Sequence, residues 1–281
     1  MIQHEYSIYS LAWFPLFLFF LRMLDQNTTL VIHTVAPKKG LLKTAYIVLF
    51  HSWTGFLCTR IVVHTEESRQ KFLRTTLCNA GVEVVPLANA APARHKPRKF
   101  DAKKVELLCF GFLTPEKGFD VAIDAVKGLK NARLTVAGDV YPVPKQKDLD
   151  FKKLLKEKSR GVKNVRFVNK FLSDEKRNKL FEKTDFFLLP YRSISQSAVL
   201  SEAWSNGKIP VCSDLPAFRE EIGNDKYGVL FRTGDAGDLR KKIEELVRNG
   251  KKREKVLANV KRLAKQRSFE ALAKRYLQWK N

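Results

Sequence analysis

Cysteines are scarce in this chain, and their spacing argues against two classes of protein. The 281 residues include only four, at positions 58, 78, 109 and 212, with no Cys-x-x-Cys pair. This pattern fits neither a zinc site of paired cysteines nor a disulfide framework. We interpret Cys109 and Cys212, which lie in apolar runs, as small core residues of a protein in a reducing compartment.

A long hydrophobic run is also missing. The most apolar segment, 11–21, has 11 residues before Arg22 and is interrupted by Pro15, so it is too short to cross a bilayer. The first ten residues contain no Lys or Arg, and no small-residue cleavage site clearly follows. We therefore predict neither a transmembrane helix nor a secretory signal peptide here.

Acidic residues are few relative to basic ones. The chain has 29 Asp and Glu against 52 Lys and Arg, a net charge of +23. Up to Arg98 there are 11 basic and 5 acidic residues, which leaves 41 and 24 in the remainder, so no single basic tail accounts for the excess. The positive electrostatic potential of such a chain favours binding to phospholipid headgroups, polyprenyl phosphates or nucleic acid. A Lys-rich solvated surface explains the excess of basic residues equally well. Interleaved aromatic and basic residues typical of an RNA-binding sheet are not evident, so we expect no nucleic acid partner.

Strand and helix patterns alternate through the second part of the chain. Residues 88–99 are rich in Ala, Pro, Arg and Lys and predict a linker. Helical patterns cover 119–129, 148–159, 174–183, 196–206 and much of the chain after Asp238. Between them lie apolar runs typical of buried strands, at 105–110, 132–137, 164–168, 185–190, 209–212 and 228–231. This alternation predicts a parallel sheet covered on both faces.

Two strand-to-helix turns carry residues suited to binding an anion. The first follows the strand at 105–109 and contains Gly111, Lys117 and Gly118 before a helix. The second follows 186–190 and leads through Gln196 and Ser197 into a helix that carries Glu202. Unpaired amides at a helix start favour an anion, a lysine suits a diphosphate, and a carboxylate can accept hydroxyl groups. A capped helix with a solvated glutamate is the plainer alternative for the second turn.

Several segments, in order, resemble the nucleotide-sugar half of the retaining GT-B glycosyltransferases of glycosyltransferase family 4. The resemblance runs from about Val105 to Phe231. The matching segments are GFLTPEKG, LTVAG, VRFVNKFLSDE, DFFLLPY, QSAVLSEAWSNGKIPVCSD and YGVLF. It implies an α/β protein of GT-B type, with two Rossmann-like domains and parallel sheets.

The resemblance assigns roles to individual residues. Gly111 and Lys117 would bind the donor, with Lys117 on its diphosphate, and Glu202 would hold the ribose hydroxyls. Lys117 and Glu202 are also our first two catalytic candidates. The turn before Glu202 would face the diphosphate and the sugar, through Gln196, Ser197, Ala198 and Val199.

Two positions depart from the family. Phe112 stands where the family commonly has an arginine of the diphosphate clamp. Ile194 stands eight positions before Glu202, where a first glutamate usually contacts the donor sugar. A branch of the family also lacks that glutamate, and Gln196 is our hypothesis for a substitute contact.

The first part of the chain resembles the second half of the family's acceptor-side domain. The segment 11–21 would be a helix of that domain, with part of its apolar surface exposed. His33, at a strand end, matches the family's histidine in the cleft and is our third catalytic candidate; a histidine satisfied by backbone groups is the alternative. His64 ends the next strand, where the family usually has a small polar residue, and we interpret it as structural. Earlier strands of such a domain have no counterpart, so we expect an incomplete N-terminal domain.

These observations predict three regions and one activity. We expect a partial acceptor-side domain with linker at 1–98, a nucleotide-sugar domain at 99–265, and a C-terminal helix at 266–281 that crosses back to the first domain. The activity is transfer of a hexose, with retention, from a nucleotide diphosphate sugar to a glycan or lipid-linked acceptor. The alternative is a non-catalytic or split-enzyme subunit that needs a partner chain supplying the missing half-domain.

The expected setting is the cytoplasm, with peripheral contact to an anionic membrane surface as a further possibility. We expect no cofactor besides the donor substrate. We also expect no metal, because Asp148 and Asp150 open a Lys-rich helical stretch and do not end a strand.

Overall fold

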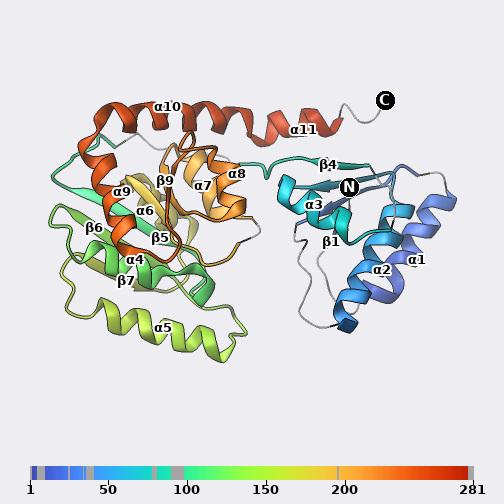
Figure 1. Ribbon diagram of the computed structural model, residues 1–281, viewed down its shortest axis with the longest axis horizontal. Coiled ribbons are helices and arrows are strands. Elements are labelled where there is room, and N and C mark those ends of the chain that lie inside the picture. Colours follow the sequence, from blue (N-terminus) through green and yellow to red (C-terminus); the bar gives the residue numbers. More distant parts are fainter. Residues whose placement is uncertain are drawn as a thin grey trace. The chain divides into compact units, whose positions relative to one another are not determined.

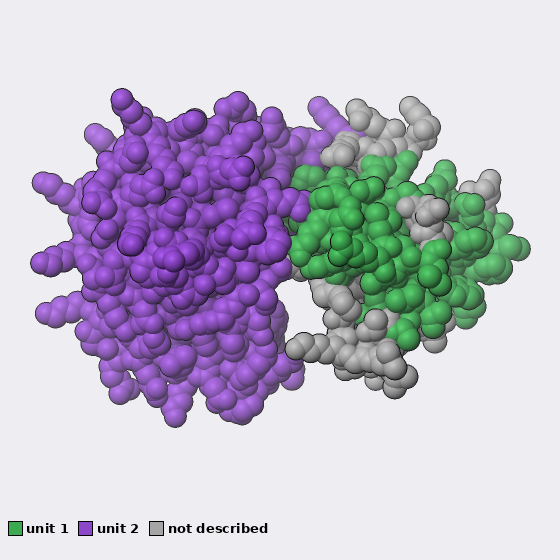
Figure 2. Space-filling model, viewed as in Figure 1, with its two compact units in different colours: residues 1–87 green, residues 88–281 purple. Residues whose placement is uncertain are grey.

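The computed structural model describes residues 2–4, 10–24, 26–33, 35, 41–77, 81–89, 98–194 and 196–277. The chain divides into two compact units, 1–87 and 88–281 (Figures 1 and 2). Each unit contains one parallel sheet. The expected division at 98 and 265, and the crossing of the last helix, stay predictions.

The first unit is a four-stranded sheet in the order β1-β2-β3-β4, with each strand parallel to its neighbour. Its elements are β1 Ile2–His4, α1 Ser10–Met23, β2 Thr29–Ile32, α2 Leu41–Leu57, β3 Arg60–Val63, α3 Glu66–Arg74 and β4 Val82–Val84. The leucine, valine and isoleucine residues of β2 and β3 are buried, as is Phe72 of α3. Short apolar strands joined by helices give this layered arrangement because a parallel pair needs a crossover connection.

Helices α1 and α2 are apolar on more than one face. Phe14 and Leu18 of α1 lie in the core, yet Phe20 on the same helix is 59% exposed. On α2, Trp53 and Phe56 are 53% and 77% exposed. Within the described ranges, no helix has the length and apolarity needed to cross a membrane. The expected helix at 11–21, with part of its surface exposed, is present.

The second unit is a six-stranded parallel sheet in the order β10-β9-β8-β5-β6-β7. Its strands are β5 Val105–Phe110, β6 Ala132–Gly138, β7 Val165–Asn169, β8 Phe186–Leu189, β9 Ile209–Ser213 and β10 Val229–Phe231. The helices are η1 Pro115–Lys117, α4 Phe119–Val126, α5 Gln146–Ser159, α6 Asp174–Lys183, α7 Ala198–Ser205, α8 Pro216–Ile222, α9 Ala236–Arg248, α10 Gly250–Gln266 and α11 Phe269–Leu277. All six strands predicted for this region are present, whereas α8 has no counterpart among the predicted helices.

The strand order places helices on both faces of this sheet. From β5 the chain moves through β6 to β7, and it then crosses to β8 on the other side of β5. Because such crossovers are right-handed, α4 and α5 cover one face and α6 and α7 the other. Helix α9 packs on α4 and α10 packs on α7, so these later helices complete the two layers (Figure 1). The direction in which successive strands are added to the sheet therefore reverses between β5 and β8.

His51 on α2 makes the stability of the first unit depend on pH. Its ring is 1% exposed, and its Nδ1 lies 2.7 Å from Oγ1 of Thr75. Burial lowers the pKa of His51 from 6.5 to about 4. Between about pH 4 and pH 6.5, His51 is therefore protonated in the unfolded chain but neutral in the folded chain. Protonation stabilises the unfolded state, so the free energy of unfolding has its full value above pH 6.5 and decreases as the pH falls to about 4.

We expect the free energy of unfolding of this unit to fall by about 1.4 kcal/mol per pH unit over that window, or about 3 kcal/mol in total. Urea unfolding at pH 7.5 and at pH 4, monitored by hydrogen exchange of α2, measures the change. His51→Asn keeps a side-chain N–H but does not titrate, so its unfolding free energy should vary less with pH. An equal pH dependence in this variant would contradict the assignment.

Candidate functional site

Two loops of the second unit meet at the reversal of strand order. One follows β5 and carries Gly111 and Lys117, and the other follows β8 and leads into α7. In open parallel sheets the carboxyl ends of the strands beside such a reversal form a crevice where ligands bind. A Cβ added to Gly111 would lie 3.8 Å from Cγ2 of Val199, so the structure brings the two predicted turns together.

Lys117 ends the short helix η1 and lies against an aromatic ring. Its Nζ is 3.9 Å from the centroid of the Tyr191 ring, and Tyr191 is fully buried at the end of β8. Burial lowers the pKa of Lys117 from 10.5 to about 8. The cation is thus held at the sheet edge by a ring face and is only partly hydrated, which strengthens its interaction with an anion.

Arg192 joins the two loops, and sequence reasoning did not identify it. Its guanidinium donates to both carboxylate oxygens of Asp120, at 2.9 and 2.7 Å, and to the carbonyl of Pro115 at 2.8 Å. Its backbone N–H donates to the carbonyl of Glu116 at 2.8 Å. These bonds hold the loop before Lys117 against the loop after β8. No local pattern signals them, because the partners are about seventy residues apart.

The start of α7 has the form expected of an anion-binding turn. Ser197 is the N-cap, and its Oγ accepts from the N–H of Leu200 at 3.2 Å. Gln196 and Val199 are half-buried, and Ala198 is exposed. The first amides of a helix have no acceptor within the helix, so the amides of Ala198 and Val199 suit an external anion. Ser195 lies outside the described residues.

Glu202 lies on α7 beside α6. Burial raises the pKa of its carboxyl group; Arg177 opposes this shift and Asp174 adds to it. Arg177 pairs with Asp174 at 3.2 Å, and within the described residues its buried Nε has no hydrogen-bond partner. The half-buried carboxylate can accept hydroxyl hydrogen bonds that also reduce the cost of its burial.

An aromatic cluster occupies the place of the absent arginine. Phe112 stacks on Tyr141 with a centroid separation of 3.8 Å, and Phe171 meets it edge to face at 5.9 Å. The three residues follow β5, β6 and β7, and Tyr141 and Phe171 are 48% and 59% exposed. Position 112 therefore supplies a stacking surface and no charge. The other departure, Ile194, packs against the core of the unit.

The remaining catalytic candidate belongs to the first unit. His33 follows β2, and its Nδ1 lies 2.9 Å from Nε2 of His64, which follows β3. His64 is 7% exposed, and its Nδ1 lies 2.9 Å from the carbonyl oxygen of Val85. The contact between the two histidines was not predicted from the sequence.

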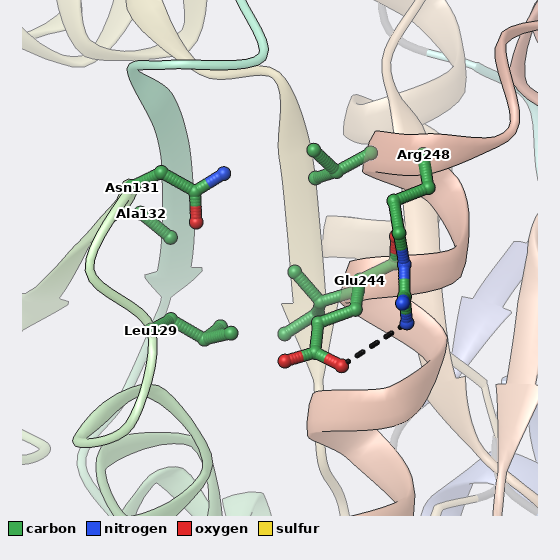
Figure 3. A pocket seen from close by; sticks show the side chains of 7 residues that line it. Leu129, Asn131, Ala132, Glu244 and Arg248 are labelled. Carbon is green, nitrogen blue, oxygen red and sulfur yellow. Dashed lines mark hydrogen bonds and ion pairs between the residues drawn. The ribbon is translucent and has the colours of Figure 1, made fainter.

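Neither Asp148 nor a pocket beside α9 suggests another active site. Asp148 occupies the third position of α5, where its carboxylate accepts from the N–H of Lys145 at 3.3 Å. Within the described ranges, no group of three His, Cys, Asp or Glu side chains could hold a metal ion. A pocket between the start of β6 and α9 is lined by Asn131, Glu244, Arg248 and apolar side chains (Figure 3). It lies at the amino end of its strand, away from Lys117.

Comparisons with known proteins agree with this fold. Residues 91–263 match the family model described as glycosyl transferases group 1. An uncharacterized glycosyltransferase of Methanocaldococcus jannaschii is 26% identical over 164 residues, which make up 58% of this chain and 44% of that protein. A phosphatidyl-myo-inositol mannosyltransferase of Mycobacterium leprae is 27% identical over 183 residues, with 63% and 46% covered. The chain thus spans about half the length of these curated relatives.

A solved structure confirms the fold. The Anabaena HepE protein in complex with UDP superimposes with a TM-score of 0.73 at 14% identity, over 90% of this chain and 71% of that one. The predicted α/β fold with parallel sheets, as in GT-B glycosyltransferase structures, is therefore confirmed.

Proposed function

Because the chain belongs to the family of glycosyl transferases group 1, we propose that it binds a nucleoside diphosphate sugar and takes part in transferring the sugar to an acceptor hydroxyl. The observation that carries this proposal is the meeting of Lys117 and the start of α7 at the reversal of strand order. A lysine and helix amides supply positive charge for a diphosphate, and Glu202 supplies acceptors for ribose hydroxyls. The UDP complex of a protein with the same fold supports this choice of ligand.

The finer details are proposals from the sequence. They are membership of glycosyltransferase family 4, a hexose as the transferred sugar, and retention at its anomeric carbon. In the proposed reaction the bond from that carbon to the diphosphate oxygen breaks, and a bond to the acceptor oxygen forms on the same face. The departing diphosphate, stabilised by Lys117 and the α7 amides, takes the proton of the acceptor hydroxyl. No protein nucleophile is required.

The setting of the reaction is also a proposal. A net charge of +23 and the exposed apolar side chains of α1 and α2 support contact with an anionic membrane surface, with a glycan or lipid-linked acceptor. Cytoplasmic location and the absence of a metal requirement remain predictions, as does a chain that completes the N-terminal domain. The alternative of a non-catalytic subunit is not favoured by the family match.

Glu202→Gln tests the nucleotide site. We expect it to weaken binding of a ribonucleoside diphosphate by about 1.5 to 3 kcal/mol, or about 10- to 150-fold, because it removes a charged acceptor of ribose hydroxyls. The deoxyribose analogue should lose much less affinity. Calorimetry with UDP, GDP, ADP and their deoxy analogues measures both losses.

The matched control is Glu175→Gln, since Glu175 is an exposed glutamate of α6 whose side chain is 74% accessible. This control should bind each nucleotide as the unaltered chain does. Equal losses for the ribose and deoxyribose forms in Glu202→Gln would mean that Glu202 is structural. Failure of every nucleotide to bind the unaltered chain would overturn the proposed function.

A further inference from the structure

The second unit gathers its exposed large apolar side chains at one edge of the sheet. Among the described residues of this unit, all of them except Phe269 lie on α5 or in the turns after β6 and β7. They are Tyr141, Val143, Leu149, Leu154 and Phe171, with Val143 89% exposed. Helix α5 packs on β7, the last strand of the sheet, so these residues share one side of the unit (Figure 1).

The same edge carries basic side chains without acidic partners. Three lysines of α5 form ion pairs with carboxylates of other segments, namely Lys147, Lys152 and Lys158. Six further cations on α5, on β7 or between and after them are exposed, and none forms an ion pair within the described ranges: Lys153, Lys156, Arg160, Lys163, Arg166 and Lys170. The outward side of α5 also exposes Asp150 and Glu157. The edge therefore has an excess of uncompensated positive charge.

This combination of side chains fits a lipid surface. Aromatic rings such as Phe171 can stack on nucleic acid bases, but aliphatic side chains such as Val143 and Leu154 gain free energy by leaving water. Elements that lie in a membrane interface combine apolar and aromatic side chains with Lys and Arg, whose charges attract anionic headgroups. A solvated basic surface would not need the exposed apolar side chains.

We propose that the edge formed by α5, β7 and the turns after β6 and β7 binds a surface of anionic phospholipids. Val143 and its apolar neighbours would enter the headgroup region, and the unpaired cations would meet the phosphate groups. The inference rests on the membrane contact in the proposed function and assigns that contact to the second unit. Because Tyr141 stacks on Phe112, which follows Gly111, this surface adjoins the loop that leads to Lys117. Lipid binding would therefore bring the proposed donor site close to the membrane.

Sedimentation of the full chain with vesicles tests the surface. The probes are vesicles of phosphatidylcholine alone and of phosphatidylcholine with an equal part of phosphatidylglycerol. We expect binding to the mixed vesicles and little binding to phosphatidylcholine alone, because the cations attract anionic headgroups. Equal binding to both kinds of vesicle, or binding to neither, would overturn the proposal.

Two triple variants of equal net charge locate the contact. The first replaces three lysines of the edge by glutamine, at Lys153, Lys156 and Lys163. The second replaces three exposed lysines of α10 that have no ion pair within the described ranges, at Lys251, Lys255 and Lys265.

We expect the first triple variant to bind the mixed vesicles about 100-fold more weakly, or about fivefold for each cation removed. The second should lose less than about fivefold. Equal losses would show that net charge governs binding and would overturn the proposal. A loss of affinity for a duplex oligonucleotide, with vesicle binding unchanged, would show that this edge binds nucleic acid instead.

The apolar side chains have a test of their own. Val143→Ser combined with Leu154→Ser should weaken binding to the mixed vesicles by about tenfold, because less apolar surface leaves water. The matched control is Phe269→Ser, since Phe269 is 74% exposed but lies on α11. This control should bind as the unaltered chain does. Equal affinity in the double variant and the unaltered chain would leave no role for the apolar side chains and would overturn the proposal.

Nucleotide affinity separates this inference from the proposed function. Both triple variants should bind UDP, GDP and ADP within about twofold of the unaltered chain, as expected for distant, independent sites. If the unaltered chain binds the mixed vesicles but none of these nucleotides, the proposed function fails while the vesicle results still decide the surface. If it binds a nucleotide but no vesicles, only the lipid-binding surface is overturned.

Discussion

Lys117→Ala is expected to weaken nucleoside diphosphate binding by about 1.5 to 3 kcal/mol, or about 10- to 150-fold, the range for a hydrogen bond to a charged group. The ammonium group lies over the ring of Tyr191, and burial lowers its pKa to about 8. A diphosphate that approaches this poorly hydrated cation gains more than it would from an exposed lysine. Calorimetry with UDP, GDP and ADP at pH 7 measures the loss.

The pKa of Lys117 adds a dependence on pH. A bound diphosphate stabilises the charged amine, so binding is strongest below pH 8, where the free amine is already protonated. As the pH rises through about 8, the amine loses its proton and the dissociation constant should increase by up to about tenfold per pH unit. The phosphate groups are already ionised in this range, since their last pKa is about 6.

Two variants make this result specific. Lys117→Gln should show a smaller increase above pH 8, because it has no titrating amine. Lys179→Ala removes an exposed lysine of α6, whose side chain is 67% accessible, and should bind as the unaltered chain does. Equal affinity in Lys117→Ala and the unaltered chain would remove Lys117 from the site.

Gly118→Ala is expected to destabilise the second unit by about 3 to 5 kcal/mol and to abolish nucleotide binding. Gly118 joins η1 to α4 with φ at +60°, and an added Cβ would lie 2.0 Å from the carbonyl oxygen of Pro190. This oxygen belongs to the backbone, so it cannot move aside as the end of a flexible side chain can. The loop after β5 would have to move away from β8, and Lys117 would leave the Tyr191 ring.

Gly161→Ala is the matched control for this strain. Gly161 also has a positive φ, +74°, but an added Cβ would have no atom within 4 Å. Gly161→Ala should lower the free energy of unfolding by only about 1 kcal/mol, the penalty of the backbone conformation alone. Urea unfolding, monitored by hydrogen exchange of β5 and β8, measures the loss of stability in both variants. Similar losses in the two would show that the close approach at Pro190 does not matter.

The sequence by itself determined the layout of the second unit. Apolar runs of strand length alternate with helical periods, and this local pattern predicted all six strands of the sheet. It also predicted the turn that carries Lys117 and the turn that leads into the helix of Glu202, because a strand, a turn and a helix start can be recognised from neighbouring residues. Helix α8 was missed, since it has only seven residues and offers few periodic positions.

Only the tertiary structure decided how the site residues are held. Tyr191 supports Lys117, Arg192 binds Asp120, and the ring of Phe112 stacks on Tyr141. In each pair the partners follow different strands of the sheet, so only the assembled sheet brings them together.

The histidine pair shows the same division. The strand-end position of His33 was visible in the sequence, but the partner of its Nδ1 was not. That partner depends on the register of two strands joined by a long helix, and a shift of one residue would turn His64 to the other face of the sheet. Local sequence sets which element forms, whereas register and long-range packing set which side chains meet.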